Sequence, residues 1–272
     1  MASKTDNYVF TRDMLDNSRL NLFHHLWTKS FGYVIHPSIP VDKENLRVAD
    51  IGTGTGIWLL DVHDKLPKSA QLYGMDISFD ATPPIETLPS NITLRHLNVK
   101  DPIPEDLVGV FDIIHIRFFV FVLLEEEVPS MVEKLSKLLK PGGYLQWVEP
   151  NNQTIRVETT KPENKTENIL ALMNRTKSQD PRLNPTWAPG LGKIFSDSGL
   201  VDVEVDAHDS PPHLAFLMHE CGLIMHELIA RKTQNEQVAE ELKQLLPRVI
   251  HETREGAYIT VVRFTVIGKK LG

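Results

Sequence analysis

Three glycines at alternate positions follow directly on a short apolar run, and this arrangement constrains the fold more than any other feature of the sequence. The segment reads Val48-Ala49-Asp50-Ile51-Gly52-Thr53-Gly54-Thr55-Gly56-Ile57. A short apolar run that ends in glycines is typical of a buried strand followed by a tight turn. Glycine permits sharp turning and lets backbone N–H groups approach a ligand. The sequence therefore predicts a strand, a ligand-binding turn and a helix in succession.

Strand-like and helix-like segments alternate beyond this turn. The spacing of apolar residues predicts helices over Ile57 to Leu66 and Glu125 to Leu139, the second ending at a Pro-Gly-Gly sequence. The expected strands cover residues 46–51, 71–76, 92–97, 111–116 and 144–148, with later strands at 201–205 and 259–267. Strands that alternate with helices favour a parallel, doubly wound sheet, so the expected fold class is α/β.

Three regions can be distinguished along the 272 residues. Residues 1–45 are expected to form a helical lead-in or cap, because Leu15, Leu22, Phe23 and Leu26 recur at helical spacing. Residues 46–150 hold the alternating core. Residues 151–272 are expected to complete the same domain with a helical insertion, two helices near 214–232 and 237–252, and the last two strands.

The composition limits the classes of protein and partner. The formal net charge is −7, which disfavours general binding to a phosphate backbone. Cys221 is the single cysteine, so an intrachain disulfide and a zinc site of several thiolates are excluded. The first seven residues are too polar for a secretory signal, and the apolar run from Ile113 to Leu124 is too short for a membrane span. We therefore expect a cytoplasmic protein that binds neither membranes nor nucleic acid.

Eleven histidines raise the question of a metal site. His219 and His226 each precede a glutamate, but they lie seven residues apart and form no His-Glu-x-x-His pattern. Positions seven apart share a helical face. We interpret the two histidines as lining a pocket or the core, and we predict no metal.

Acidic residues flank the glycine turn. Asp50 precedes the first glycine, and Asp76 ends the next expected strand. A dinucleotide-binding turn would place its third glycine at position 57, where this chain has Ile57. A carboxylate at position 50 suits an ammonium group, and an acid at position 76 can accept the hydroxyls of a ribose. S-Adenosylmethionine carries both groups, whereas the turn is unfavourable for a nicotinamide-dependent oxidoreductase.

Several segments together resemble the class I S-adenosylmethionine-dependent methyltransferases. Besides the turn and its two acids, they are Phe111-Asp112-Ile113-Ile114-His115 and Leu138-Leu139-Lys140-Pro141-Gly142-Gly143-Tyr144-Leu145. The lead-in is similar to the start of fungal methyltransferases of secondary metabolism, through Arg19-Leu20-Asn21-Leu22-Phe23-His24-His25 and Gly32-Tyr33-Val34-Ile35-His36-Pro37-Ser38-Ile39-Pro40. The resemblance implies a Rossmann-like, doubly wound, seven-stranded sheet that is mostly parallel with an antiparallel last strand. The N-terminal helical segment and the helical insertion would form a substrate cap.

The resemblance also implies roles for individual residues. Asp50 and the glycine turn would hold the methionine part of S-adenosylmethionine, Asp76 would hold the ribose, and residues 98–99 would face the adenine. The tip of the fourth strand would lie near the reactive methyl group. The predicted cofactor-binding residues are Asp50, Gly52, Thr53, Gly54, Gly56, Asp76, Ile77, Asn98, Val99, His115 and Arg117. Two alternatives stay open: Asp76 could cap a helix N-terminus, and His115 and Arg117 could make structural contacts only.

The expected reaction is methyl transfer to an O, N or S atom of a small-molecule natural product by a monomer or homodimer. A general base is needed only where the acceptor atom is protonated, and His24, His25 and His115 are the candidate bases. Tyr8 is a further candidate to contact the ligands. A second hypothesis keeps the cofactor without methyl transfer, as a rearrangement or cyclisation enzyme or a regulator of secondary metabolism.

Overall fold

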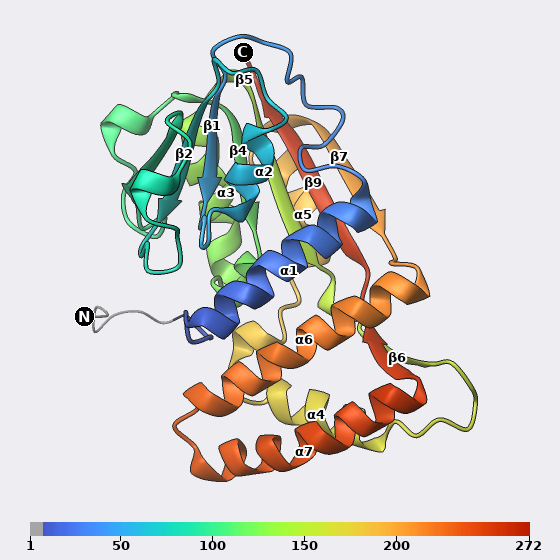
Figure 1. The fold of residues 1–272 in the computed structure, drawn as a ribbon. Coiled ribbons are helices and arrows are strands. Elements are labelled where there is room, and N and C mark those ends of the chain that lie inside the picture. The colour runs from blue at the N-terminus through green and yellow to red at the C-terminus, as the bar shows by residue number, and fades with distance from the viewer. Residues whose placement is uncertain (1–7) are drawn as a thin grey trace.

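A seven-stranded sheet forms the centre of the molecule in the computed structural model (Figure 1). The structure describes residues 8–272, so the first seven residues of the expected lead-in lie outside the described part. The spatial order is β3-β2-β1-β4-β5-β9-β7. The strands are β1 (Arg47–Ile51), β2 (Gln71–Asp76), β3 (Ile92–His96), β4 (Phe111–Arg117), β5 (Leu139–Pro150), β7 (Leu200–His208) and β9 (Arg263–Lys270). β9 runs antiparallel to both of its neighbours, and the pairs among β1 to β5 are parallel. The predicted Rossmann-like, doubly wound α/β fold with an antiparallel last strand is confirmed.

Helices cover both faces of this sheet because its strands are apolar on both. Successive side chains of a strand point to opposite faces. Val48 of β1 therefore packs with α2 (Ile57–His63), whereas Ala49 belongs to the core cluster that includes α3 (Val128–Leu138) and α5 (Leu191–Asp197). Buried parallel strands of this kind place their carboxyl ends along one edge, where loops can form a site.

A second group of helices lies beyond one end of the sheet. α1 (Met14–Phe31) runs beside α6 (Pro212–Lys232), and α6 packs on α7 (Glu236–Glu255) and α4 (Glu167–Lys177) (Figure 1). α1 begins where the Asp13 carboxylate accepts two backbone N–H groups of the first turn, and it ends at a glycine in the left-handed conformation. Of these helices, α1, α4 and α6 line a cavity next to the carboxyl ends of β4 and β5.

One predicted strand is wrong in its extent. The run 259–267 is expected to be a single strand, but the chain forms β8 (Ala257–Thr260) and then β9. β8 pairs antiparallel with β6 (Arg156–Thr159) in a separate two-stranded sheet. β6 itself follows residue 150, where the sequence predicts a helical insertion. β-Branched residues favour extended backbone without selecting a partner strand. The chain therefore changes sheets at residues 261–262, and the sequence pattern does not reveal it.

The buried face of α1 also differs from the expected leucine stripe. Leu22 is 44% exposed, whereas Asp16, Arg19 and His24 are buried. Arg19 donates to the Asp16 carboxylate from Nε at 3.0 Å and from Nη2 at 2.5 Å. Buried charges are tolerated when they are paired, so a pattern of apolar residues alone misses this face.

Short 3-10 helices lie in the connections, at Ile85–Thr87, Glu105–Leu107, Phe119–Phe121, Glu125–Glu127, Asn152–Thr154, Pro181–Leu183 and Ala188–Gly190. Of the helices within residues 8–272, none is both long and apolar enough to cross a membrane.

Candidate functional site

A cavity of about 290 Å³ opens at the carboxyl ends of β1, β2 and β4. From β1 the sheet extends through β2 and β3 on one side and through β4 and β5 on the other, so the strand order reverses between β1 and β4. Open α/β sheets bind ligands at such a switch point. The predicted residues that line this cavity are Asp50, Gly52, Thr53, Gly54, Asp76, Ile77, Asn98, Val99, His115 and Arg117.

The glycine turn adopts a conformation that favours glycine at each of its three glycine positions. The φ angles are +69° at Gly52, +55° at Gly54 and +74° at Gly56. A Cβ atom on Gly52 would lie 2.7 Å from the Phe119 ring, so the turn also needs glycine there for close packing. The Gly54 N–H donates to Asp76 Oδ2 at 2.9 Å. The turn is thereby attached to the tip of β2.

Asp50 and His115 are adjacent because the parallel register pairs them across β1 and β4. Asp50 Oδ1 and His115 Nδ1 are 2.7 Å apart, and the imidazole stacks on Trp58 with 4.0 Å between ring centroids. Burial lowers the pKa of His115, so the ring is neutral and its Nδ1–H donates to Asp50. The Thr53 hydroxyl donates to the other oxygen at 2.8 Å. Two donors thus fix the Asp50 carboxylate at the edge of the cavity.

Arg117 places a half-buried guanidinium close enough to Asp50 for the two charges to interact. Burial lowers its pKa to about 10, so it stays charged at neutral pH. Its Nη2 donates to His24 Nδ1 at 3.2 Å, and His24 Nε2 lies 3.0 Å from Asp61 Oδ2. Burial lowers the pKa of His24 to about 3, so that ring is neutral and both of its nitrogens are engaged. Within residues 8–272, no carboxylate forms an ion pair with Arg117 at 4 Å or less.

Asp76 holds the backbone at the end of β2. Its Oδ1 accepts the N–H groups of Ile77 at 2.7 Å and Ser78 at 3.3 Å, and it lies 3.8 Å from Arg12 Nη1. Burial raises the pKa of Asp76. No helix begins here, since the next helical segment is Ile85–Thr87. The alternative that Asp76 caps a helix N-terminus is therefore wrong.

Some predicted residues lie elsewhere. Gly56, His24 and His25 do not line the cavity. His25 is exposed on α1, with its ring 5.3 Å from that of His24. Asn98 and Val99, after β3, do line the cavity, and Asn98 Oδ1 accepts the Lys100 N–H at 3.1 Å.

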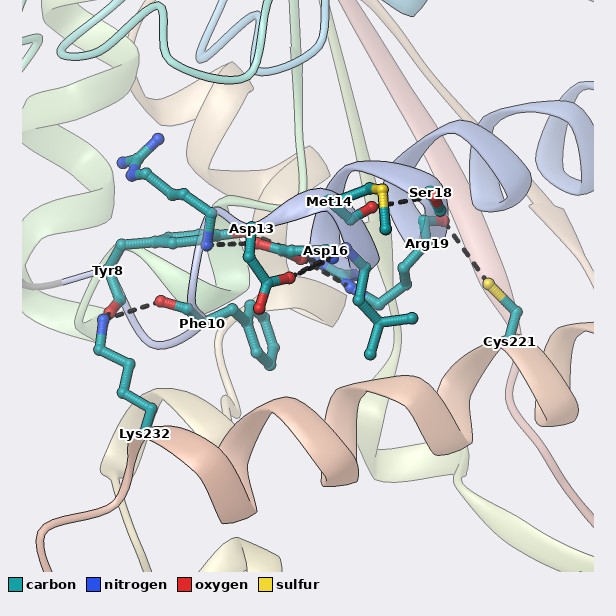
Figure 2. A network of polar contacts seen from close by, with 11 residues as sticks. Tyr8, Phe10, Asp13, Met14, Asp16, Ser18, Arg19, Cys221 and Lys232 are labelled. Carbon is teal, nitrogen blue, oxygen red and sulfur yellow. Dashed lines mark hydrogen bonds and ion pairs between the residues drawn. The ribbon is translucent and has the colours of Figure 1, made fainter.

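The segment before α1 forms a wall of the cavity that sequence reasoning largely missed. Tyr8, Arg12 and Arg19 line the cavity, and Arg12 stacks over the Tyr8 ring at 4.5 Å. Figure 2 shows how α6 holds this region: Lys232 donates to the backbone carbonyls of Tyr8 and Phe10, and the Cys221 thiol donates to the carbonyl of Arg19. Two aromatic residues followed by an arginine at alternate positions, Tyr8, Phe10 and Arg12, are the sequence pattern that could have indicated it.

Glu149, at the end of β5, is a buried acid that sequence reasoning also missed. Its Oε1 accepts the Trp147 indole N–H at 2.7 Å and the Phe119 backbone N–H at 2.6 Å. Burial raises the pKa of Glu149 to about 8, so it is mostly protonated at neutral pH. It holds the turn after β4, whose aromatic residues Phe118 and Phe121 line the cavity.

A family model described as a methyltransferase domain matches residues 29–205 of this chain. The chain belongs to this methyltransferase family. It is 38% identical over 150 residues to the N-methyltransferase verN of Clonostachys rogersoniana, covering 55% of this chain and 51% of that protein. It is 35% identical over 159 residues to the N-methyltransferase tcpN of Claviceps purpurea, covering 57% and 56%. The chain spans about half the length of the relatives it matches.

The fold of this methyltransferase-family chain also occurs in solved structures. Phosphoethanolamine N-methyltransferase 2 of Haemonchus contortus, solved with S-adenosyl-L-methionine, superimposes with a TM-score of 0.57 at 14% identity. The match covers 98% of this chain and 59% of that one. At this level of identity the likeness shows the class I methyltransferase fold.

The methyltransferase-family chain has a second cavity, of about 160 Å³, between the helices α1, α4 and α6. Its walls come from α1, α4, α6 and the β8–β9 segment. Arg19, Phe118 and Phe121 line both cavities. The two cavities are therefore neighbours separated by these three side chains.

Proposed function

We propose that the chain is an S-adenosylmethionine-dependent methyltransferase that acts on an O, N or S atom of a small-molecule natural product. One observation carries the proposal: the Asp50 carboxylate and the Arg117 guanidinium line the same cavity, and they do not form an ion pair with each other at 4 Å or less. Such a pair complements the ammonium and carboxylate groups of an α-amino acid. Asp76 adds an acceptor for ribose hydroxyls in the same cavity.

The residues present fit the whole cofactor. Asp50 would hold the ammonium group, Arg117 the carboxylate, Asp76 the ribose, and Asn98 with Val99 the adenine. The backbone of the glycine turn allows a ligand to approach closely. When bound, S-adenosylmethionine supplies an activated methyl group whose transfer needs no acid for the leaving group.

The contribution of the chain is to position groups and exclude water, which can lower a reaction barrier by roughly 7–11 kcal/mol in favourable cases. Neutral His115 orients Asp50, and neutral His24 orients Arg117. Protonated Glu149 holds the turn after β4. We therefore propose positioning roles for His115 and His24 in place of the base role, and no role in the site for the exposed His25.

The second cavity is our candidate site for the methyl acceptor, because it adjoins the first through Arg19, Phe118 and Phe121. Its lining comes from the lead-in 1–45, from residues 151–272 and from the turn after β4, which supports the proposed substrate cap. The names of the relatives favour nitrogen as the methylated atom. We further propose a cytoplasmic monomer or homodimer with no nucleic-acid or membrane partner, in line with the net charge of −7.

The test is to incubate the purified chain with S-adenosylmethionine carrying an isotopically labelled methyl group and fungal culture extract fractionated by charge and polarity. We expect S-adenosylhomocysteine to form only with certain fractions, together with a labelled small molecule. Binding of the cofactor without its consumption in any fraction would instead support a non-methylating role on the same fold.

A further inference from the structure

The second cavity has the size and surface of a site for a small ring. Its volume of about 160 Å³ resembles the roughly 150 Å³ of an engineered apolar cavity that binds benzene. Most of its walls are aromatic, methionine and aliphatic side chains, such as Phe23, Trp27, Met218 and Leu223. An apolar ring is the ligand that such walls bind best.

The charged residues in its wall disfavour a cationic ligand. Arg19, Lys177 and Arg263 line the cavity, and no aspartate or glutamate of the described residues does. Asp16 neutralises Arg19. Arg263, by contrast, is 6% exposed, and its Nη1 donates to the Ser210 hydroxyl at 3.4 Å and the Val261 carbonyl at 3.1 Å. A ligand ammonium group would enter a positive environment without a counter-ion, which is unfavourable.

Two histidines of α6 line the cavity, and one of them has both ring nitrogens engaged. The Thr253 hydroxyl donates to the Val249 carbonyl at 2.8 Å. Its oxygen therefore accepts the Nε2–H of His219 at 2.9 Å, while His219 Nδ1 accepts the Ile259 N–H at 3.2 Å. His219 is thus a structural contact between α6, α7 and β8.

The other histidine, His226, hydrogen-bonds through only one of its two ring nitrogens within the described residues. The Thr176 hydroxyl donates to the Leu172 carbonyl at 2.9 Å, so its oxygen accepts the Nδ1–H of His226 at 2.8 Å. The Nε2 atom then carries a lone pair, and no partner for it is found among residues 8–272. Burial lowers the pKa of His226 to about 4, which keeps this nitrogen an acceptor at neutral pH.

We propose that the second cavity binds an uncharged, largely apolar ring that carries an N–H or O–H donor, and that His226 Nε2 accepts its hydrogen bond. The proposal rests on the proposed function for the identification of this ligand as the methyl acceptor, but the cavity chemistry can be tested by itself. His226 is then the residue that selects ligands with a donor, and the basic lining excludes amines in their ammonium form.

Indole, indene and tryptamine test the proposal as probes. Indole and indene have the same ring shape, but indole alone has an N–H, and tryptamine adds an ammonium group. Calorimetric titration into the full chain saturated with S-adenosylhomocysteine should show indole binding roughly fivefold more tightly than indene, the value of one net hydrogen bond. Tryptamine should bind more weakly than indole. Failure of S-adenosylhomocysteine itself to bind would count against the proposed function, and the probes would then be titrated into the chain alone.

Variants of His226 separate recognition from packing. In His226→Asn the side-chain amide can still donate to Thr176 but no longer reaches the Nε2 position, so indole and indene should bind equally. His226→Gln places an amide oxygen near the Nε2 position and should restore part of the preference for indole. His213→Asn, at an exposed histidine of the same helix, is the control and should bind as the wild type does. Equal binding of indole and indene to the wild type, preference for tryptamine, no indole binding, or an unchanged preference in His226→Asn would each overturn the proposal.

Discussion

Replacing Asp76 by asparagine tests whether the acid at the end of β2 binds a ribose. A carboxylate has about four acceptor positions, and the N–H groups of Gly54, Ile77 and Ser78 already occupy three of them. One strong hydrogen bond from a ribose hydroxyl can therefore be added. A hydrogen bond to a charged acceptor contributes about 1.5–3 kcal/mol, so Asp76→Asn should weaken S-adenosylhomocysteine binding by about 2 kcal/mol, or roughly 30-fold.

The assay is a cycle of two proteins and two ligands measured by calorimetric titration. Removing the ribose hydroxyls from S-adenosylhomocysteine should cost the wild type about 2 kcal/mol. The same removal should cost the Asp76→Asn variant under about 0.5 kcal/mol, since the interaction is already lost. Asp80→Asn changes an exposed acid in the same loop and should behave as the wild type. Equal costs of hydroxyl removal in wild type and Asp76→Asn would refute the ribose assignment.

Three further predictions follow from the site. Gly54→Val and Gly56→Val introduce similar backbone strain, about 1–2 kcal/mol in each case, so both should lower the melting temperature by a similar amount. Because Gly54 lines the cavity, Gly54→Val alone should abolish cofactor binding in a titration, and equal cofactor affinities of the two variants would contradict this. Arg117→Met should weaken S-adenosylmethionine binding about 10- to 100-fold, whereas the affinity for 5′-methylthioadenosine, which lacks the amino-acid part, should not change. An equal loss of affinity for both ligands would show that Arg117 does not bind the carboxylate. Burial raises the pKa of Glu149 in the folded protein to about 8, so between its unfolded pKa and pH 8 the native state binds more protons than the unfolded state, and the free energy of unfolding falls as pH rises. In urea unfolding at pH 5 and pH 8, Glu149→Gln should reduce this dependence of the free energy of unfolding on pH. An unchanged dependence would show that Glu149 does not cause it.

The sheet and the first-cavity residues were predictable because their patterns are local and strong. The glycine turn, the acids on either side of it and the strand spacing follow directly from the sequence, and the positive φ angles at the three glycines explain why that pattern needs glycine. Strand register then brings Asp50 beside His115 without any further signal in the sequence.

The remaining features depend on contacts between distant segments. The change of sheet between β8 and β9 requires β6 as a partner, and no local pattern encodes that partner. Glu149 acquires its protonated state only because the fold buries it. The free nitrogen of His226 depends on Thr176 of another helix and on where that hydroxyl donates its proton. Composition and periodicity contain none of this information.

Titration of the purified chain with S-adenosylmethionine and, separately, with NAD tests most directly whether the turn at 52–56 and the charged groups around it recognise a sulfonium nucleoside. We predict saturable binding of S-adenosylmethionine and of S-adenosylhomocysteine at one site, and no binding of NAD. Saturable binding of NAD without affinity for S-adenosylmethionine would contradict the account.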